Sequence, residues 1–453
     1  MNETSKVAGR LSHILKWQYV ASAVQGVLGA LYMILLARVL GVAEFGVFSL
    51  VTALITSSSL FCEARMQEVV VKKFHVLGED RQTHMIEPDF RIRLYDYFLF
   101  ESLTRLAPAL LLAALTPVIL SYYNHESVSS SLIYIACIGF VFSKSGNGSA
   151  IGLLRVMDHA NLIALGTTVD WGLRLLLSAA LAMTGLLSVK IALCISFLVP
   201  TAMNFWYIFT ARRLFNAQIQ IQGDPRWSIR GFATRMTGDI RLIAAQIGLS
   251  VSDLMAKDLD ILILSLTMSL ESIGLYRAAK YLVQILWRAV DPFYLALLPE
   301  VQRLWAAKKY PELKFMLIRI SKQLFLGAII LIAAMWLGLW LFSDIFFGKG
   351  YEGLPNLAPQ MSLWLLVCAP LIWGGTLAFA IGHPEITLVG SLIGSITGVI
   401  LFFSLVPILA LTGAAIAWSS TLAIGFAFTA LVSVRVARRK IKSSNQNMVA
   451  DQP

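Results

Sequence analysis

Residues 277–299 read RAAKYLVQILWRAVDPFYLALLP, a stretch that is apolar enough for a lipid bilayer and yet carries polar side chains at regular intervals. The intervals are three, four, four and three residues, so an α-helix gathers the polar positions on one stripe about 80° wide. Because a charge at the bilayer centre costs about 2.5–3.5 kcal/mol on insertion scales, this stripe is not expected to face lipid. We interpret the helix as one wall of a translocation path, with a stripe formed by Arg277, Lys280, Gln284, Arg288 and Asp291.

The composition of the whole chain supports a membrane location. Of its 453 residues, 57% are hydrophobic and only 14% are charged, which is too apolar for a soluble domain of this length. A formal net charge of +11 would suggest nucleic acid as the partner of a soluble protein, but in a membrane protein an excess of Lys and Arg in cytoplasmic loops explains it. We therefore predict an all-α, polytopic membrane protein that binds no nucleic acid.

Twelve apolar runs are long enough to cross a bilayer, which takes about 20 residues each. With the N-terminus inside, the loop and span-end Lys and Arg residues fall on the cytoplasmic side, Arg105 included, and only Arg38, Lys190 and Lys349 lie outside. Both termini are therefore predicted to be cytoplasmic. The predicted spans are 17–38, 45–64, 98–121, 131–154, 161–184, 187–210, 240–267, 271–298, 318–342, 356–381, 385–408 and 411–434.

The longest charged interruption near the middle divides the chain into two lobes of six spans. We predict an N-terminal lobe at 1–211, a cytoplasmic linker at 212–236 and a C-terminal lobe at 237–453 that ends in a basic cytoplasmic tail. An internal repeat supports this division, because EFGVF at 44–48 follows the first span as SIGLY at 272–276 follows the seventh. Residues 159–166 likewise align with 383–390. Duplicated six-helix bundles are typical of transporters that handle their substrate between the halves.

The seventh predicted span carries a second polar stripe, at steps of four, three, four and three residues. Counted from the turn near residue 269, Asp260 lies at the depth of Arg277 and Lys280, and Asp253 at the depth of 284–288. Opposite charges at matching depth predict ion pairs between the seventh and eighth spans. These pairs either brace two neighbouring helices or line a shared cavity. The stripe consists of Gln246, Ser250, Asp253, Lys257 and Asp260.

Polar faces recur on other spans of the first half. Because polarity is confined to particular helices of both halves, we favour a shared cavity over simple bracing. The first span offers Gln18, Ser22 and Gln25, the second Thr52, Thr56, Ser59 and Glu63, the fourth Lys144 beside Asn147, and the fifth Thr167, Asp170, Arg174 and Ser178.

The interior charges suggest what the cavity binds. Arg is suited to bidentate contacts with phosphate and Lys to point-charge contacts, so a phosphate-bearing substrate is predicted. The candidate substrate-binding cations are Lys144, Arg174, Lys257, Arg277, Lys280 and Arg288, and the interior anions are Asp170, Asp253, Asp258, Asp260 and Asp291.

Asp170 and Asp253 have two alternative roles. A carboxylate in a partly dry site has a movable protonation state and could couple transport to a proton or a sodium ion. Alternatively, each forms a salt bridge one turn away, with Arg174 and Lys257. No metal-binding or catalytic motif is found, so we expect neither an enzyme nor a cofactor. The candidate polar and ion-coupling residues of the cavity are Gln25, Asp170, Asp253, Asp260, Gln284 and Asp291.

Short motifs spread over the chain resemble the polysaccharide-export branch of the multidrug/oligosaccharidyl-lipid/polysaccharide (MOP) flippase superfamily, the Wzx-type flippases. The motif ARVLG at 37–41, followed by EFGVFSL at 44–50, looks like the family signature after its first span. Its counterpart in the second half is GLYRAA at 274–279, and LPE at 298–300 and FGKGY at 347–351 are also similar to family segments.

The resemblance implies two six-helix lobes of the kind found in MATE and MurJ transporters, around a cavity that opens alternately to the two membrane faces. It further implies a lipid-linked oligosaccharide cargo, carried on undecaprenyl pyrophosphate across a bacterial inner membrane for O-antigen, capsule or exopolysaccharide synthesis, with a polysaccharide polymerase or export complex as a partner. Two alternatives stay open. One is a multidrug cation exporter of the same fold, and the other is a non-transporting membrane scaffold or polymerase partner.

Overall fold

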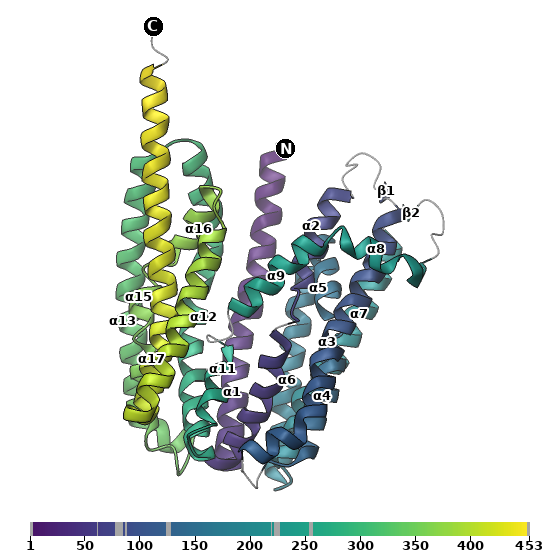
Figure 1. The fold of residues 1–453 in the computed structure, drawn as a ribbon, viewed down its shortest axis with the longest axis vertical. Helices are drawn as coiled ribbons and strands as arrows, with labels where there is room; N and C mark the ends of the chain where they lie inside the picture. Colours follow the sequence, from purple (N-terminus) through teal and green to yellow (C-terminus); the bar gives the residue numbers. More distant parts are fainter. Residues whose placement is uncertain are drawn as a thin grey trace. The chain divides into compact units, whose positions relative to one another are not determined.

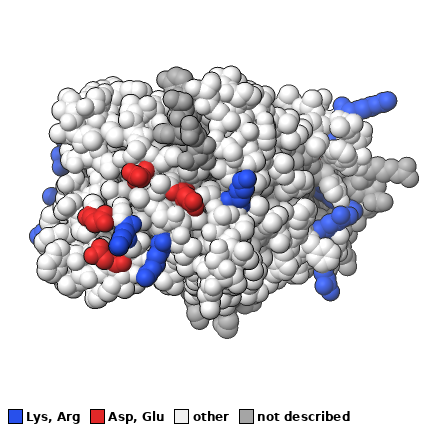
Figure 2. Space-filling view, turned by 90° about the horizontal axis from the view of Figure 1, so that it is seen from below, with Lys and Arg blue, Asp and Glu red and all other residues white. Residues whose placement is uncertain are grey.

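The computed structural model describes residues 3–60, 62–77, 85–86, 88–123, 128–218, 220–221, 227–252 and 257–450, and nearly all of them are helical (Figure 1). The chain divides into two compact units, Met1–Val251 and Ser252–Pro453. The prediction of an all-α polytopic protein is confirmed. Seven helices of the described chain are long and apolar enough to cross a membrane. Figure 2 shows the molecule from below, where acidic and basic side chains lie among a majority of uncharged residues.

The N-terminal unit contains the first six predicted spans. Its helix α1 contains two of them, which meet at Gly41, a residue with φ of +75° that a Cβ would strain. The helices are α1 (Glu3–Leu60), α2 (Met66–Leu77), α3 (Pro88–Tyr123), α4 (Ser130–Lys144), α5 (Asn147–Val156), α6 (Ala160–Met183), α7 (Val189–Gln218), α8 (Phe232–Thr237) and α9 (Ile240–Ser252), with a 3₁₀ turn at Ile229–Gly231. The short strands β1 (Met85–Ile86) and β2 (Gln220–Ile221) pair in parallel.

The C-terminal unit contains the remaining spans. Its last helix again holds two of them, here separated at Ala410, which has a φ of +49°. The helices are α11 (Leu259–Leu264), α12 (Leu270–Ala306), α13 (Tyr310–Phe346), α14 (Leu354–Ser362), α15 (Leu365–Cys368), α16 (Trp373–Ala380) and α17 (Glu385–Ala450).

The fourth span of each half is interrupted, although both were predicted to be continuous. In the first half α4 ends at Lys144 and α5 starts at Asn147, with Gly146 in the left-handed conformation between them. In the second half the break between α15 and α16 contains Pro370, 224 residues after Gly146. This is the same offset that relates 159–166 to 383–390, so the two halves share the position of the break as well as the sequence repeat.

The seventh predicted span is not the continuous helix expected at 240–267. Helix α9 ends at Ser252 and α11 starts after Asp258, which has a non-helical φ of −138°; Asp253 lies outside the described residues. The predicted stripe from Gln246 to Asp260 is therefore wrong as a single helical face. The ion pairs described below hold Asp258 and Asp260 where the helix is interrupted, and such contacts are not visible in helical periodicity.

The boundary between the units lies at Val251, whereas the linker between the lobes was predicted at 212–236. Buried carboxylates explain why the chain after the linker packs with the N-terminal unit. Asp239 accepts hydrogen bonds from Arg93 Nη1 at 3.0 Å and Tyr97 Oη at 2.7 Å. Asp96 on α3 accepts hydrogen bonds from Trp227 Nε1 at 2.8 Å and from Arg235. The linker end is thus anchored to α3.

Candidate functional site

Two groups of charged residues lie within the predicted spans, one in each unit. The first, the N-terminal cluster, consists of Glu63, Arg105, Lys144, Asp170 and Arg174. The second, the C-terminal cluster, consists of Lys257, Asp258, Asp260, Arg277 and Lys280.

The N-terminal cluster is built around an ion pair within α6. Arg174 binds Asp170 one turn earlier through both carboxylate oxygens, with Nε 3.1 Å from Oδ1. The Arg174 guanidinium also lies over the ring of Trp171, 4.6 Å from the centroid, and Trp171 packs edge-on against Tyr32 of α1. The side chains of Arg174 and Asp170 are 15% and 17% exposed. The ion pair and the Trp171 ring therefore fix the orientation of the guanidinium, and part of the pair remains at the surface.

Two further cations lie within electrostatic range of this pair. Lys144 interacts with Arg105 and Arg174 as well as with Glu63 and Asp170. Arg105 lies 3.8 Å from Glu63 and over the ring of Phe140, and its buried Nε has no hydrogen-bond partner among the described residues. The N-terminal cluster therefore holds three cations and two anions, and the buried Nε of Arg105 accounts for one N–H without an acceptor among the described residues.

The break between α4 and α5 positions Lys144. The α5 N-terminus is capped by Glu101 of α3, whose carboxylate accepts hydrogen bonds from Gly148 N at 2.8 Å and Ser149 N at 3.0 Å. The carbonyls freed at the end of α4 are bound by Asn204 Nδ2 of α7. Lys144 is the last residue of α4 and its side chain is exposed. Since a lysine within a span does not face lipid, we infer that it faces water.

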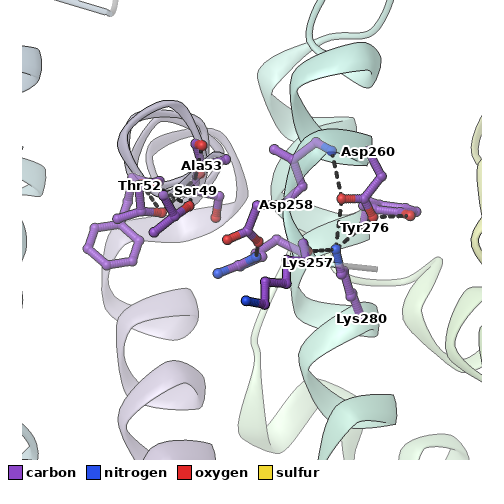
Figure 3. Close-up of polar contacts among 12 residues, drawn as sticks. Ser49, Thr52, Ala53, Lys257, Asp258, Asp260, Tyr276 and Lys280 are labelled. Atoms are coloured by element: carbon purple, nitrogen blue, oxygen red, sulfur yellow. Dashed lines mark hydrogen bonds and ion pairs between the residues drawn. The ribbon is translucent and has the colours of Figure 1, made fainter. Parts of the chain in front are cut away.

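The C-terminal cluster contains one ion pair that is completely buried and a second, Arg277 with Asp258, whose side chains are 16% and 15% exposed. Lys280 on α12 lies 2.7 Å from both carboxylate oxygens of Asp260 on α11, and both side chains are 0% exposed. Tyr276 donates a hydrogen bond of 2.7 Å to the same carboxylate (Figure 3). Lys280 Nζ also donates to the Lys257 carbonyl, next to the interruption of the seventh span. Lys280 therefore links α12 to the backbone at the interruption as well as to Asp260.

A second pair completes this cluster. Arg277 Nη1 donates to Asp258, the residue at the N-cap of α11, and the ammonium of Lys280 lies 5.6 Å from the ring centroid of Trp418 on α17. The predicted ion pairs between the seventh and eighth spans are thus confirmed for Asp260 with Lys280, and Asp258 is the partner of Arg277. Lys280 does not contact a cavity in this structure, because no part of its side chain is exposed.

The other predicted site residues have different surroundings. Arg288, Gln284 and Gln25 are partly exposed, and within the described part of the chain Arg288 has no ion-pair partner. Asp253 lies outside the described residues, and the side chain of Asp291 is not described. The hydroxyls of the second-span stripe, Thr52 among them, donate to carbonyls of their own helix.

Two residues of the site were missed by sequence reasoning. Arg105 was counted with the cytoplasmic cations, but it lies inside α3 with a side chain 9% exposed. Glu101, which caps α5, is buried four residues earlier on the same helix. Charged residues four apart within the apolar run 98–121 were the available signal. No group of His, Cys, Asp and Glu suited to a metal ion is found among the described residues.

Comparison with known proteins gives one family match. Residues 16–305 match the family model described as polysaccharide biosynthesis protein. No curated protein matches the chain significantly.

Solved transporter structures resemble the chain over almost its whole length. The lipid II flippase MurJ in an inward closed conformation is 14% identical, with a TM-score of 0.69 over 96% of this chain and 92% of that chain. An inward-facing multidrug resistance MATE family transporter of the MOP superfamily is 13% identical, with a TM-score of 0.63 over 95% and 96%. A mutant of the Vibrio cholerae MATE transporter VcmN is 12% identical, with a TM-score of 0.61 over 98% and 99%. The chain therefore has a fold of the MurJ and MATE type.

Proposed function

The chain belongs to the polysaccharide biosynthesis protein family, and on that premise we propose that it is a flippase for undecaprenyl-pyrophosphate-linked oligosaccharide repeat units. The cargo serves O-antigen, capsule or exopolysaccharide synthesis and crosses the bacterial inner membrane by alternating access. The N-terminal cluster binds the pyrophosphate in this proposal. The observation that carries it is the exposed Lys144, grouped with Arg105 and Arg174 inside an apolar unit.

The geometry of this cluster fits a phosphate ligand. Lys144 offers three donors from the end of α4, Arg105 adds a buried positive charge, and Arg174 is held by Asp170 and Trp171. Trp171, which is partly exposed and packs on the buried Tyr32, adds aromatic surface of the kind that packs on sugar rings. Asp170 forms an ion pair with Arg174, which is the predicted alternative to a role in proton or sodium coupling.

The C-terminal cluster has a different role in the proposal. Lys280, Asp260 and Tyr276 are buried together and brace α11 against α12, so they do not bind cargo directly. Arg288, partly exposed on the same helix, is the cargo-binding candidate of this unit. The proposed sites therefore combine Lys144, Arg105 and Arg174 with Arg288.

The test is transport by the full-length protein in vesicles that contain a fluorescent lipid-linked oligosaccharide. Flipping is read from the fraction of label that an external quencher reaches. The variants Lys144→Gln and Arg174→Gln are expected to lower the initial rate at least tenfold, which corresponds to about 1.4 kcal/mol. Arg174→Lys keeps the charge without the bidentate geometry and should fall between.

The matched control is Lys190→Gln, which removes one exposed lysine from the start of α7, outside the cluster. It should flip like the unchanged protein. Unimpaired flipping by Lys144→Gln together with Arg174→Gln, at equal protein levels, would reject the cluster as the cargo site. Uptake of cationic dyes with no lipid flipping would instead support the multidrug exporter.

The membrane and its orientation are part of the proposal. Both termini are placed in the cytoplasm because the Lys and Arg residues of 303–322 and 435–442 lie near the ends of α12, α13 and α17. Reporter fusions after residue 450 and within 348–353 test this. The fusion after residue 450 should be active only with a cytoplasmic reporter, and the opposite pattern would invert the proposed topology.

A further inference from the structure

A groove lies on the C-terminal unit, where the end of α12 and the start of α13 meet α16 and the last turns of α17. Its volume is about 720 Å³, within the roughly 300–1,000 Å³ of ligand pockets. The floor is apolar and well packed, formed by Leu313, Leu317, Leu377 and Ala437, each less than a tenth exposed. This groove is separate from both charged clusters.

Three cations line the groove, and no Asp or Glu is among the described residues that line it. Lys314 and Lys322 stand two turns apart on α13, and Arg438 projects from α17. The nearby carboxylate of Glu312 is already 3.1 Å from Lys309. The groove therefore combines an apolar floor with an excess of positive charge, a combination that fits a ligand with an anionic head and an apolar tail.

Aromatic residues mark the level of the groove relative to a membrane. The rings of Trp305 and Tyr310 lie 5.2 Å apart at the junction of α12 and α13. Trp373 is fixed by a hydrogen bond of 2.8 Å from its Nε1 to Ser321 Oγ. Trp and Tyr gather where the hydrocarbon of a bilayer meets the headgroups, and basic pockets between helices at that level suit anionic headgroups.

The outer face of α13 continues from the groove as an apolar surface. Phe315, Ile318 and Phe325 are 70%, 46% and 45% exposed, and Leu326 is 60% exposed. In a membrane protein such a surface faces lipid. We propose that the groove binds one anionic phospholipid of the surrounding leaflet, with an acyl chain on the floor and the phosphate at Lys314, Lys322 and Arg438. An uncharged lipid would leave these cations without a counter-ion, and a free phosphate would leave the floor uncovered.

The test is a lipid titration of the full-length protein in detergent, followed by native mass spectrometry. Phosphatidylglycerol is expected to bind at least tenfold more tightly than phosphatidylcholine with the same acyl chains. The variant Lys314→Gln/Lys322→Gln/Arg438→Gln should remove this preference. The matched control, Lys308→Gln/Arg319→Gln/Lys442→Gln, removes the same charge from exposed positions that do not line the groove and should keep the preference within twofold.

A second variant tests the apolar floor. Ile318→Trp fills the groove from an exposed position and should weaken phosphatidylglycerol binding at least tenfold; it decides the outcome if the triple variant does not fold. The proposal is overturned if the control loses the preference equally, or if Ile318→Trp binds normally. It is also overturned if inorganic phosphate or undecaprenyl pyrophosphate displaces the phospholipid, since the groove would then be a free-anion or a cargo site. Flipping measured in parallel separates this result from the proposed transport function.

Discussion

The ion pair of Arg174 with Asp170 in the N-terminal unit keeps about a sixth of each side chain exposed, whereas Lys280 and Asp260 in the C-terminal unit are completely buried. Both pairs were predicted from the same sequence pattern, charged residues at helical spacing within an apolar run. Their surroundings differ. Lys280 lies among Tyr276, Trp418 and a backbone carbonyl, while Arg174 has Lys144 as an exposed cationic neighbour. Spacing thus identifies which charges share a face, and burial separates the Lys280–Asp260 brace from the pairs that keep an exposed surface, Arg277 with Asp258 among them.

The largest expected effect comes from removing one partner of the buried pair. Lys280→Met leaves the Asp260 carboxylate buried without its cation, and breaking a buried pair in this way costs about 3–5 kcal/mol. Thermal unfolding of the purified protein in detergent measures the loss. The double variant Lys280→Met/Asp260→Leu should recover most of it, because it removes both charges. Unchanged stability in Lys280→Met would show that the Lys280–Asp260 pair is accessible to water, like Arg174 with Asp170.

The break in the fourth span offers the next largest effect. Gly146 has a φ of +74°, and a Cβ there would lie 2.6 Å from Phe98 Cδ1. We expect Gly146→Ala to destabilise the protein by about 1–2 kcal/mol from backbone strain alone. It should also slow flipping, because it displaces Lys144. Gly172→Ala on α6, where a Cβ meets nothing within 4 Å, is the control and should unfold at the original temperature or slightly above it, because Ala favours a helix interior over Gly.

A smaller change in stability is expected for the accessible ion pair. Arg174→Gln removes one bidentate contact within a single helix turn, and partly exposed pairs contribute about 0–1 kcal/mol. The unfolding temperature should change little, although the initial rate of flipping decreases. If Arg174→Gln destabilises the protein as much as Lys280→Met does, both ion pairs brace the fold. The proposed difference in role between the two pairs would then be wrong.

The smallest effect is expected at Ala410, which lies between the last two spans of the chain. The turn within α1 uses Gly41, but the equivalent turn within α17 uses Ala410 at a φ of +49°. Ala410→Gly relieves that strain and should stabilise the protein by less than about 1 kcal/mol. A lower unfolding temperature would contradict the strained conformation of Ala410.

Much of the architecture could be predicted because apolar run length and charge spacing are local properties. Each predicted span contains described helix, and the match of Asp260 with Lys280 followed from depth along two neighbouring helices. The interruptions were missed because their partners are distant in sequence. Glu101 stabilises the start of α5 from 47 residues away, and Asn204 binds the end of α4 from α7.

The location of Arg105 shows another limit. A cation near the predicted end of a span looks the same in sequence whether it reaches a loop or turns inward. Its partners, Glu63 and Phe140, come from two other segments, so only packing decides between these positions. The same applies to Lys280, whose sequence surroundings resemble those of Arg288 although only Arg288 keeps an exposed surface.

The Glu101 carboxylate has a consequence for selectivity. The start of a helix ordinarily attracts phosphate through its free amides, but at α5 those amides are already occupied by the protein's own anion. In the proposed function, a cargo phosphate near Lys144 is therefore recognised by side chains and not by these α5 amides. Side chains can be lengthened, shortened or exchanged one at a time without rebuilding the backbone, so the same scaffold can be retuned to a different glycan carrier by single substitutions.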